Sequence, residues 1–379
     1  MFIFAYYNKY TLMLQAKQTK LLLVGDSLAI GGAEKVHAVL SGYFAAQGIE
    51  VHNAVIEDMV AYNYSGALLN LGLLKKKHNG LMLKIKRVAQ LRSYIKKHRF
   101  DYIIDFRMHY RPWQELIMAR FVFTVPTVYT VHSYVTHWYL PEKKWLARLT
   151  YNTTYGVVAI CNKIEETIKK RHGLTNSTTI YNPVDLKYID AKLAEPHTPL
   201  PYKYIMGAGR MDVDNVKQFD KLIAAYAESI LPMSDVKLVL LGDGELKEKL
   251  QEQAKQQRVA DKVVFAGFKE NPYPYMRDAL FFVLSSRNEG LPMVLIEALA
   301  CGTPVVSFNC LTGPSEIVEH EENGLLVEGQ DYMDLCEAMG HMYVEPELYS
   351  HCKANARPSV QKFDINAIGR QWLDYLNIN

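Results

Sequence analysis

Two glutamates eight positions apart, Glu289 and Glu297, stand at the two ends of a short segment that could bind a polar ligand. Glu289 begins a Glu-Gly-Leu-Pro loop, and Glu297 lies in an apolar run that Gly302 ends. Pro292 is typical of a first helical turn, and Gly302 of a helix end. A carboxylate inside this helix is costly unless a donor reaches it. An exposed glutamate on a polar face is the alternative, but the adjoining loop favours a ligand site.

Two glycine-rich turns could approach phosphate groups. The first, Gly25 to Glu34, contains Gly31-Gly32 and lies between an expected strand and an expected helix. Glycine exposes bare backbone there, and the N-terminus of a helix attracts anions. The spacing matches neither the dinucleotide fingerprint nor the Walker pattern, so this segment taken alone favours a simple tight turn.

The second turn carries two cations. Gly207-Ala-Gly209-Arg210 is followed, seven residues after the arginine, by Lys217. Arginine binds phosphate oxygens with two prongs and lysine acts as a point charge, so the pair could hold a diphosphate. Taken alone, each of the two residues is better explained as an ordinary surface position.

The elements that must position these residues alternate between strand and helix. Short apolar runs predict strands at 20–25, 51–56, 101–105, 127–131 and 156–160, and again at 204–208, 236–241, 263–266, 280–284 and 304–308. Helical patterns occupy the intervals, including 33–47 and 81–97. The alternation predicts an α/β protein of two doubly wound, parallel-sheet domains that face each other across a cleft. We expect an acceptor-side domain at 1–185 and a donor domain at 186–360, with an amphipathic helix at 364–376 that packs back on the first domain.

The composition is that of a soluble globular protein, with 379 residues, 49% hydrophobic and 22% charged. No run approaches the roughly 20 apolar residues that span a bilayer. Residues 1–19 begin with an apolar stretch that lacks a leading positive region, which makes a poor signal peptide and leaves open a non-native start. Five scattered cysteines without a CxxC pair indicate neither disulfides nor zinc. A cytoplasmic location fits.

The charge is distributed unevenly. Residues 1–185 hold 24 basic and 12 acidic residues, whereas the remainder holds 43−24 = 19 basic and 40−12 = 28 acidic ones. The basic residues concentrate between Lys75 and Arg99, where no acidic residue occurs. A solvated helical face and a patch for an anionic membrane surface or phosphorylated acceptor explain this segment equally well. No nucleic-acid-binding motif accompanies it.

Taken in order, these motifs resemble the retaining GT-B glycosyltransferases of family 4, from about Leu21 to Trp372. The resemblance rests on Gly31-Gly32-Ala-Glu34, His132 in Thr-Val-His-Ser, Arg210 with Lys217, Gly242-Asp-Gly244, Gly267 to Tyr275, Glu289-Gly-Leu-Pro with Glu297, Gly302-Thr-Pro-Val-Val, and Gly313-Pro-Ser-Glu-Ile. The two-glutamate block is the specific part. Arg210 and Lys217 are seven residues apart instead of the usual five, which indicates a two-residue loop insertion.

The resemblance implies a role for each matched residue. Glu297 would accept hydrogen bonds from the nucleotide ribose, and Glu289 would contact the donor sugar. The cations would neutralise the leaving diphosphate, Phe268 would lie near the base, and His132 would lie near the sugar or the attacking hydroxyl. The remaining donor contacts would come from the backbone of Gly31, Gly32, Gly209, Gly290, Leu291, Pro292, Met293 and Val294.

The implied activity is transfer of a hexose or N-acetylhexosamine, UDP-linked, to a hydroxyl of a glycan or polyprenyl-linked acceptor, with an α linkage formed. Fixed cations and helix dipoles can stabilise a departing phosphate, so we expect neither a cofactor nor a metal. Asp212-Val-Asp214 is interpreted as part of the Arg–Lys loop. A nucleotide-sugar epimerase and a catalytically silent sugar-nucleotide-binding protein are the alternatives.

Overall fold

The computed structural model describes residues 18–29 and 31–378. Residues 1–17, which the expectation about the start of the chain concerns, lie outside this range. The described chain divides into two compact units. Unit 1 runs up to Ala159 and also takes Thr167–Thr178 and the residues from Gly369 onward, and unit 2 comprises Ile160–Glu166 and Thr179–Ile368.

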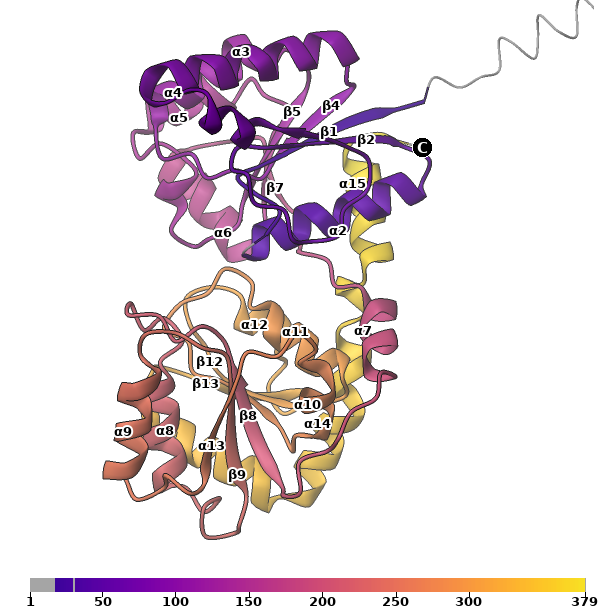
Figure 1. Ribbon diagram of the computed structural model, residues 1–379. Helices are drawn as coiled ribbons and strands as arrows, with labels where there is room; N and C mark the ends of the chain where they lie inside the picture. The colour runs from indigo at the N-terminus through magenta and orange to yellow at the C-terminus, as the bar shows by residue number, and fades with distance from the viewer. Residues whose placement is uncertain (1–17, 30, 379) are drawn as a thin grey trace, which may run out of the picture. The chain divides into compact units, whose positions relative to one another are not determined.

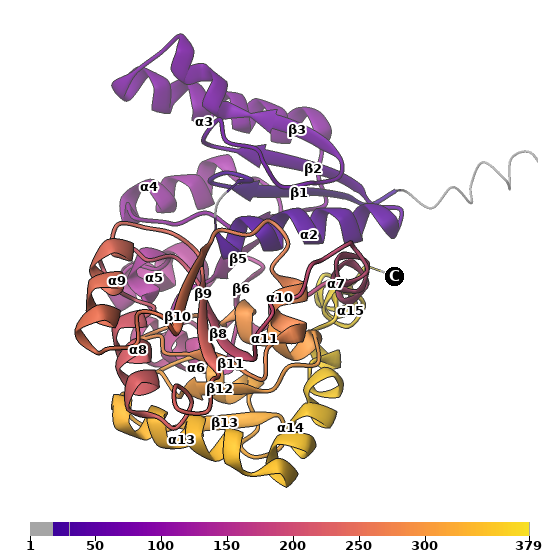
Figure 2. The ribbon, with the colours of Figure 1, turned by 60° about the horizontal axis from the view of Figure 1, so that its bottom comes forward.

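Unit 1 is built on a seven-stranded parallel sheet in the order β3-β2-β1-β4-β5-β6-β7. The strands are β1 Lys20–Gly25, β2 Glu50–Val55, β3 Ala67–Asn70, β4 Tyr102–Asp105, β5 Thr127–Val131, β6 Gly156–Ala159 and β7 Ser177–Thr179. The helices are α2 Gly32–Ala46, α3 Gly80–His98, α4 Pro112–Ile117 and α5 Lys144–Tyr151, with shorter turns η1 Leu71–Lys76, η2 Met118–Val122, η3 Thr136–Trp138 and η4 Ile168–His172. Helices α2 and α3 cover opposite faces of this sheet (Figures 1 and 2).

Unit 2 repeats the plan with six parallel strands in the order β10-β9-β8-β11-β12-β13. They are β8 Tyr204–Ala208, β9 Lys237–Leu241, β10 Val263–Gly267, β11 Phe282–Leu284, β12 Val305–Phe308 and β13 Gly324–Val327. The helices are α7 Leu186–Leu193, α8 Phe219–Glu228, α9 Lys247–Gln256, α10 Tyr273–Asp278, α11 Met293–Ala300, α12 Pro314–Ile317, α13 Tyr332–Val344 and α14 Pro346–Ser359, followed by the turn η5 Gln361–Phe363. Figure 1 shows α8 and α9 on one side of the sheet and α10 and α11 on the other.

Two helices cross the boundary between the units. Helix α6, Asn162–Thr167, starts in unit 2 and ends in unit 1, and so does the last helix, α15, Ile365–Tyr375. Asp364 caps α15, because its side chain accepts a hydrogen bond from the backbone N–H of Asn366 at 2.9 Å. Beyond the crossing, the Tyr155 hydroxyl donates to the backbone carbonyl of Tyr375 at 2.7 Å within unit 1.

The buried strands explain why the sheets form. Leu21 to Val24 of β1 are fully buried, as a parallel strand covered on both faces requires. In unit 2, apolar residues of β8, β9 and β12 form one core with the inner faces of α8, α9 and α13. The prediction of two doubly wound parallel sheets is confirmed.

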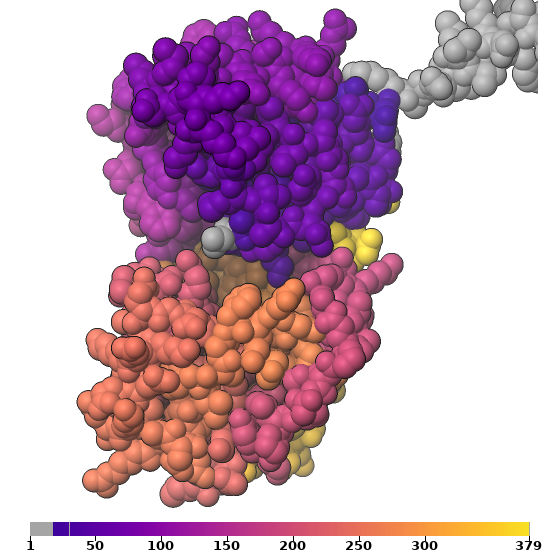
Figure 3. Space-filling model, in the orientation of Figure 1, coloured from indigo at the N-terminus to yellow at the C-terminus, as the bar shows by residue number. Residues whose placement is uncertain are grey.

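In Figure 3, indigo segments from the beginning of the chain form much of the visible face of unit 1.

Both sheets reverse their strand order at one point. In unit 1 the reversal lies between β1 and β4, and in unit 2 between β8 and β11. Ligands of open α/β sheets bind beyond the carboxyl ends of the strands at such a point. A ligand is therefore expected at the loops after these four strands.

Candidate nucleotide-sugar site

An ion pair joins the two loops at the reversal point of unit 2. Lys217 follows β8 and Glu289 follows β11, and the Lys217 Nζ lies 2.7 Å from the Glu289 Oε1. Both side chains are largely shielded, with 24% and 14% of their surface exposed. The Ser285 hydroxyl also donates to the Lys217 carbonyl at 2.7 Å. The lysine and the glutamate that the sequence singles out separately thus form one charged pair.

Glycine makes the close packing behind this pair possible. A Cβ atom at Gly209 would lie 2.9–3.1 Å from three carbons of the Lys217 stem, and the residue has a φ of +157°. A Cβ at Gly242 would lie 1.9 Å from the Gly209 carbonyl oxygen. No side chain fits between these turns. The two glycine turns therefore press together and hold the lysine stem against the end of β8.

The Glu-Gly-Leu-Pro loop is held by the segment that follows β12. The Thr312 hydroxyl donates to the backbone carbonyl of Glu289. A Cβ at Gly313 would lie 2.5 Å from Pro292 Cδ, so this backbone packs directly on the loop. Helix α11 begins at Met293, so Pro292 precedes the helix as its N-cap and is not a first-turn residue as the sequence predicts. The N–H groups of the first turn of α11 have no acceptor within the helix.

Glu297 is buried in α11. It is 7% exposed and lies between Ile296 and Ala298, which are fully buried. The Tyr273 hydroxyl donates to its Oε1 at 3.5 Å, a distance typical of a weak hydrogen bond. The alternative of an exposed glutamate on a polar face is therefore wrong.

Two residues that the sequence predicts to contact the nucleotide-sugar have exposed side chains. The Arg210 side chain is 77% exposed, and its Nη1 lies 3.3 Å from the Asp212 carboxylate. Phe268, just after β10, is 78% exposed. Gly290 and the residues Leu291 to Val294 come directly after Glu289 in the sequence and lead into α11. Arg210 pairs with Asp212, whereas Lys217 pairs with Glu289.

Arg287, which is not among the predicted site residues, holds the loop of Arg210 and Lys217. Its backbone N–H donates to the Val216 carbonyl at 2.8 Å, and its guanidinium donates to the Asp214 carbonyl at 3.0 Å. The loop turns inside this clamp, since the Asn215 N–H donates to the Asp212 carbonyl at 2.9 Å. Asp212 and Asp214 are thus engaged in loop structure. Arg287 stands two residues before Glu289, and this closeness to the two-glutamate motif is the sequence feature that could have indicated its role.

In unit 1, His132 follows β5 and makes its hydrogen bond inside the unit. Its Nε2 lies 2.9 Å from the Thr130 hydroxyl, and its Nδ1 is buried with no hydrogen-bond partner within 18–29 and 31–378. Burial lowers the pKa of His132 to about 3, so the ring is neutral at neutral pH. Gly31 and Gly32, also predicted to bind donor, are exposed where α2 begins.

A buried charge network lies at the end of β4, and no motif in the sequence indicates it. The Arg107 guanidinium donates to both oxygens of Asp105, at 2.9 and 2.7 Å, and to Glu115 at 3.0 Å. His109 Nε2 lies 3.2 Å from Asp105. Burial alone would raise the pKa of Asp105, but the neighbouring charges of Arg107 and His109 outweigh it and lower that pKa. Asp105, His109 and Glu115 have side chains of metal-ligand type within 4.8 Å, yet Arg107 already pairs with both carboxylates.

Asp26 connects the loops at the reversal point of unit 1. It follows β1, and its Oδ2 accepts the backbone N–H of Met108, which follows β4, at 2.9 Å. Burial raises the pKa of Asp26. An acid directly after a buried strand was visible in the sequence, beside the glycine turn.

A stability prediction arises from His37, which is fully buried in α2. Its Nε2 lies 3.0 Å from the Asn53 side-chain oxygen, and burial lowers its pKa to about 4. The unfolded chain, with an ordinary pKa near 6.5, binds this proton first as the pH falls. We expect His37 to remove about 3 kcal/mol from the free energy of unfolding between pH 6.5 and 4. In urea titrations at several pH values, His37→Asn should flatten this decline, and the exposed control His351→Asn should not. Equal slopes for His37→Asn and the unmutated protein would contradict the prediction.

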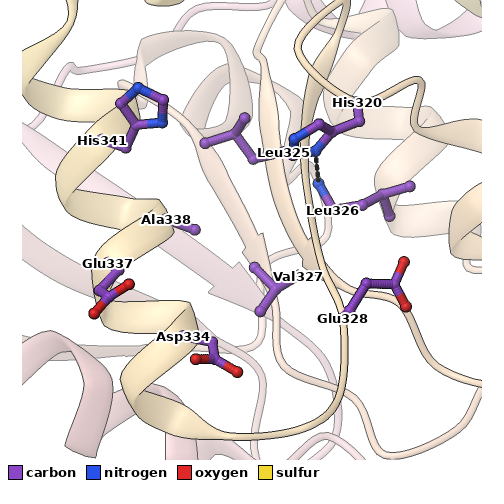
Figure 4. Close-up of a pocket in the computed structure, with 9 residues that line it drawn as sticks. All are labelled: His320, Leu325, Leu326, Val327, Glu328, Asp334, Glu337, Ala338 and His341. Carbon is purple, nitrogen blue, oxygen red and sulfur yellow. Dashed lines mark hydrogen bonds between the residues drawn. The ribbon is translucent and has the colours of Figure 1, made fainter.

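A surface pocket of about 480 Å³ lies elsewhere in unit 2, between β13 and α13. Figure 4 shows Glu328, Asp334 and Glu337 around it, with the His320 ring accepting the Leu326 N–H at 3.1 Å. None of the predicted site residues lines this pocket.

No helix among the described residues is long and apolar enough to cross a bilayer.

Comparison with known proteins covers both units. The model for Glycosyltransferase Family 4 matches residues 30–188, and the model for Glycosyl transferases group 1 matches residues 194–359. The N-acetylgalactosamine-N,N'-diacetylbacillosaminyl-diphospho-undecaprenol 4-alpha-N-acetylgalactosaminyltransferase of Campylobacter jejuni is 30% identical over 362 residues, which is 92% of this chain and 97% of that protein. The lipopolysaccharide 1,6-galactosyltransferase of Escherichia coli is 29% identical over 201 residues, 52% of this chain and 54% of that protein.

Solved structures share the fold. The Anabaena protein Alr3699/HepE, crystallised with UDP, superposes with a TM-score of 0.76 at 19% identity, covering 95% of this chain and all of that one. A point mutant of TarM from Staphylococcus aureus, solved with UDP and sugar ligands, gives a TM-score of 0.73 at 15% identity, covering 95% of this chain and all of that one. At this identity the likeness concerns the fold.

Proposed function

Because the chain belongs to the glycosyltransferases of family 4, which have the GT-B fold, we propose that it moves a hexose or N-acetylhexosamine from a UDP-linked donor to a hydroxyl of a glycan or polyprenyl-linked acceptor. Retention of configuration would give an α linkage in a cell-surface polysaccharide or glycan. The observation that carries the proposal is the Lys217–Glu289 pair at the reversal point of unit 2. The Campylobacter relative's diphospho-undecaprenol substrate supports the lipid-linked acceptor.

The donor would lie over the start of α11. In this arrangement Glu297 accepts hydrogen bonds from the two ribose hydroxyls, and its burial supports a contact shielded from water. The free N–H groups at the start of α11, together with Gly290, face the diphosphate and sugar. Phe268, exposed after β10, offers a face to the base.

The reaction builds negative charge on the departing diphosphate. Lys217 is the cation best placed to stabilise that charge, because its stem is packed on Gly209 and its ammonium is already paired with Glu289. Glu289 holds the ammonium in place and offers its second oxygen to a sugar hydroxyl. Arg210 reaches the diphosphate only by leaving Asp212, and its exposure leaves it free to turn. Gly31 and Gly32 leave bare backbone at the start of α2 for the same diphosphate.

His132 would act as a neutral group. With a pKa of about 3 it carries no charge at neutral pH, so it serves as a hydrogen-bond donor or acceptor to the sugar or the attacking hydroxyl. The acceptor hydroxyl then passes its proton to the leaving phosphate oxygen, which departs as the new glycosidic bond forms. No covalent enzyme intermediate is required in this mechanism.

We expect chelation to leave the reaction unaffected. Lys217 and Arg210 supply the positive charge that a metal provides in other transferases, so EDTA should not change the rate of UDP release. The measurement is a coupled UDP assay with and without EDTA, with added Mg²⁺ or Mn²⁺ as the control. A rate that falls about tenfold and returns with either cation would contradict the expectation.

The test of the function itself is a donor screen. Each UDP-sugar is incubated with the full chain and with extracts of lipid-linked or polysaccharide acceptors, and UDP release is followed. Product analysis by NMR then gives the anomeric configuration. Conversion of a UDP-sugar without any acceptor would indicate an epimerase, and tight UDP binding without turnover a silent binding protein.

The membrane side of the proposal begins with the segment Lys75–Arg99. It covers the end of η1 and all of α3, and its lysines and arginines are mostly exposed, with no acidic residue among them. A basic helix of this kind is attracted to anionic lipid headgroups, at which a polyprenyl-linked acceptor is anchored. The enzyme would then work at the inner face of the membrane.

A further inference from the structure

Two neighbouring helical segments of unit 1 each expose a stripe of large apolar side chains. Trp113 and Ile117 of α4 and Phe121 of η2 recur every four residues, and Trp145 and Leu149 of α5 do the same. Residues four apart on a helix lie on one face. Their exposed fractions are 61%, 54%, 60%, 54% and 46%. We call these five residues the aromatic face.

The two stripes adjoin each other. The rings of Trp113 and Trp145 lie 5.9 Å apart, and the Arg120 guanidinium donates to the backbone carbonyl of Leu149. Segments α4, η2 and α5 are in mutual contact, and Figures 1 and 2 show α4 and α5 near each other. The five side chains therefore form one continuous surface.

The core of unit 1 fixes the orientation of this surface. The opposite sides of the same segments are buried, through Met118 and Val122 in η2 and Leu146 and Ala147 in α5. These segments are thus apolar toward the core and again toward the outside. Soluble monomers rarely expose a continuous apolar patch of this kind, unless another surface covers it.

Exposed cations lie next to the residues of the aromatic face in the sequence. Between residues 111 and 149 the exposed charged residues are Arg111, Arg120, Lys143, Lys144 and Arg148, with Glu142 as the one exposed acid of that range. The other acid there, Glu115, is buried in its ion pair with Arg107. Helix α3, which contacts η2, carries further lysines and exposes Leu81, Met82 and Ile85 near its start. The face and its rim therefore carry a clear positive charge.

We propose that the aromatic face docks on the surface of an anionic lipid bilayer. Tryptophan is favoured at the level of the headgroups, where its ring is apolar and its N–H stays hydrated. Lysine and arginine beside it reach lipid phosphates while their stems cover apolar surface. Apolar insertion combined with electrostatic attraction gives stable peripheral binding, where either alone is marginal.

The charge distinguishes a bilayer from a second copy of this chain. A symmetric dimer through this face would bring its own patch against itself and place the five cations opposite five others. An anionic bilayer instead meets those cations with phosphates and the apolar stripe with acyl chains. The docking rests on the proposed use of a lipid-linked acceptor, because only such a substrate requires the enzyme at a membrane.

The test uses the full chain and vesicles of phosphatidylcholine with or without phosphatidylglycerol. We expect co-flotation with the anionic vesicles that weakens as salt rises, and quenching of tryptophan fluorescence by brominated lipid. The double variant Trp113→Ser/Trp145→Ser should lose binding by at least about tenfold and lose most of the quenching. The matched control is Met233→Ser in unit 2, which removes an 84% exposed apolar side chain and should bind as the unmutated protein does.

Two charge-reversal variants divide the electrostatic part. Lys143→Glu/Lys144→Glu acts beside the aromatic face, and reversal of Lys75, Lys76 and Lys77 acts on η1. We expect the first to abolish flotation and the second to weaken it. Since all these residues are exposed, the variants should keep the melting temperature of the unmutated protein.

Three results would overturn the docking: no flotation of the unmutated protein, equal flotation of the double tryptophan variant, or a lipid-free dimer that the double variant converts to a monomer. UDP binding, measured by calorimetry on the same preparations, reports on the proposed function separately. Intact UDP binding without flotation would refute the membrane face alone, and flotation without UDP binding would refute the proposed UDP-linked donor alone.

Discussion

Replacing Lys217 by methionine is expected to lower kcat by about 10²–10³, with a much smaller change in donor KM. Methionine keeps the stem that packs on Gly209 and removes the ammonium, whose Nζ lies 2.7 Å from Glu289. An ammonium that stabilises charge mainly as the phosphate leaves contributes to the transition state more than to the bound donor. Steady-state UDP release gives both constants.

The matched control for this variant is Lys255→Met. Lys255 also forms an ion pair with a glutamate, Glu252, at 3.2 Å, but both lie exposed on α9. Loss of such a surface pair changes the free energy of unfolding little. The kinetics of Lys255→Met should therefore equal those of the unmutated enzyme. If Lys217→Met raised KM by the whole factor and left kcat unchanged, the lysine would bind ground state and transition state alike, and its proposed role in the departure of the diphosphate would be wrong.

Replacing Glu297 by glutamine is expected to weaken UDP binding by about tenfold to a hundredfold, because two charge-assisted hydrogen bonds to the ribose are reduced to neutral ones. Glutamine has nearly the same shape as glutamate, so the side chain at position 297 should keep its buried place in α11. Calorimetric titration with UDP measures the loss of affinity, and circular dichroism shows whether the variant is folded.

A second nucleotide makes the assignment of Glu297 specific. The unmutated protein should prefer UDP to 2′,3′-dideoxy-UDP by more than the factor that Glu297→Gln loses, and the variant should keep only the smaller preference that neutral hydrogen bonds give. If the variant weakened both nucleotides to the same extent, Glu297 would support the site without contacting the ribose.

Strands covered on both faces were predictable, because their apolar runs need no further information. The predicted runs at 20–25 and 204–208 coincide with β1 and β8. The predicted strands did not include three strands at sheet edges: β3, which is half exposed, β7, which consists of Ser-Thr-Thr, and β13, which has only four residues and begins with glycine. Short edge strands are specified by their partner strand more than by their own residues.

The candidate site was predictable residue by residue but not as an arrangement. The motifs selected Lys217 and Glu289, while their ion pair depends on the strand order, which places β8 beside β11. Arg210 stood out by the same motif, yet its loop carries it toward Asp212. The Arg107 network had no sequence signal, because Asp105, Arg107 and Glu115 become partners only after burial leaves each of them without water.

The last helix makes unit 1 dependent on residues from the other end of the sequence. A Cβ at Gly369 would lie 2.3–2.5 Å from the Tyr43 ring, and Tyr155 bonds to the carbonyl of Tyr375, so these last residues complete the packing of the first unit. On the ribosome, unit 2 emerges whole while unit 1 still lacks its final piece, because domains form as their residues become available. The amino-terminal half of this enzyme is therefore the later of the two to mature, and a truncation at the carboxyl terminus damages the opposite end of the polypeptide.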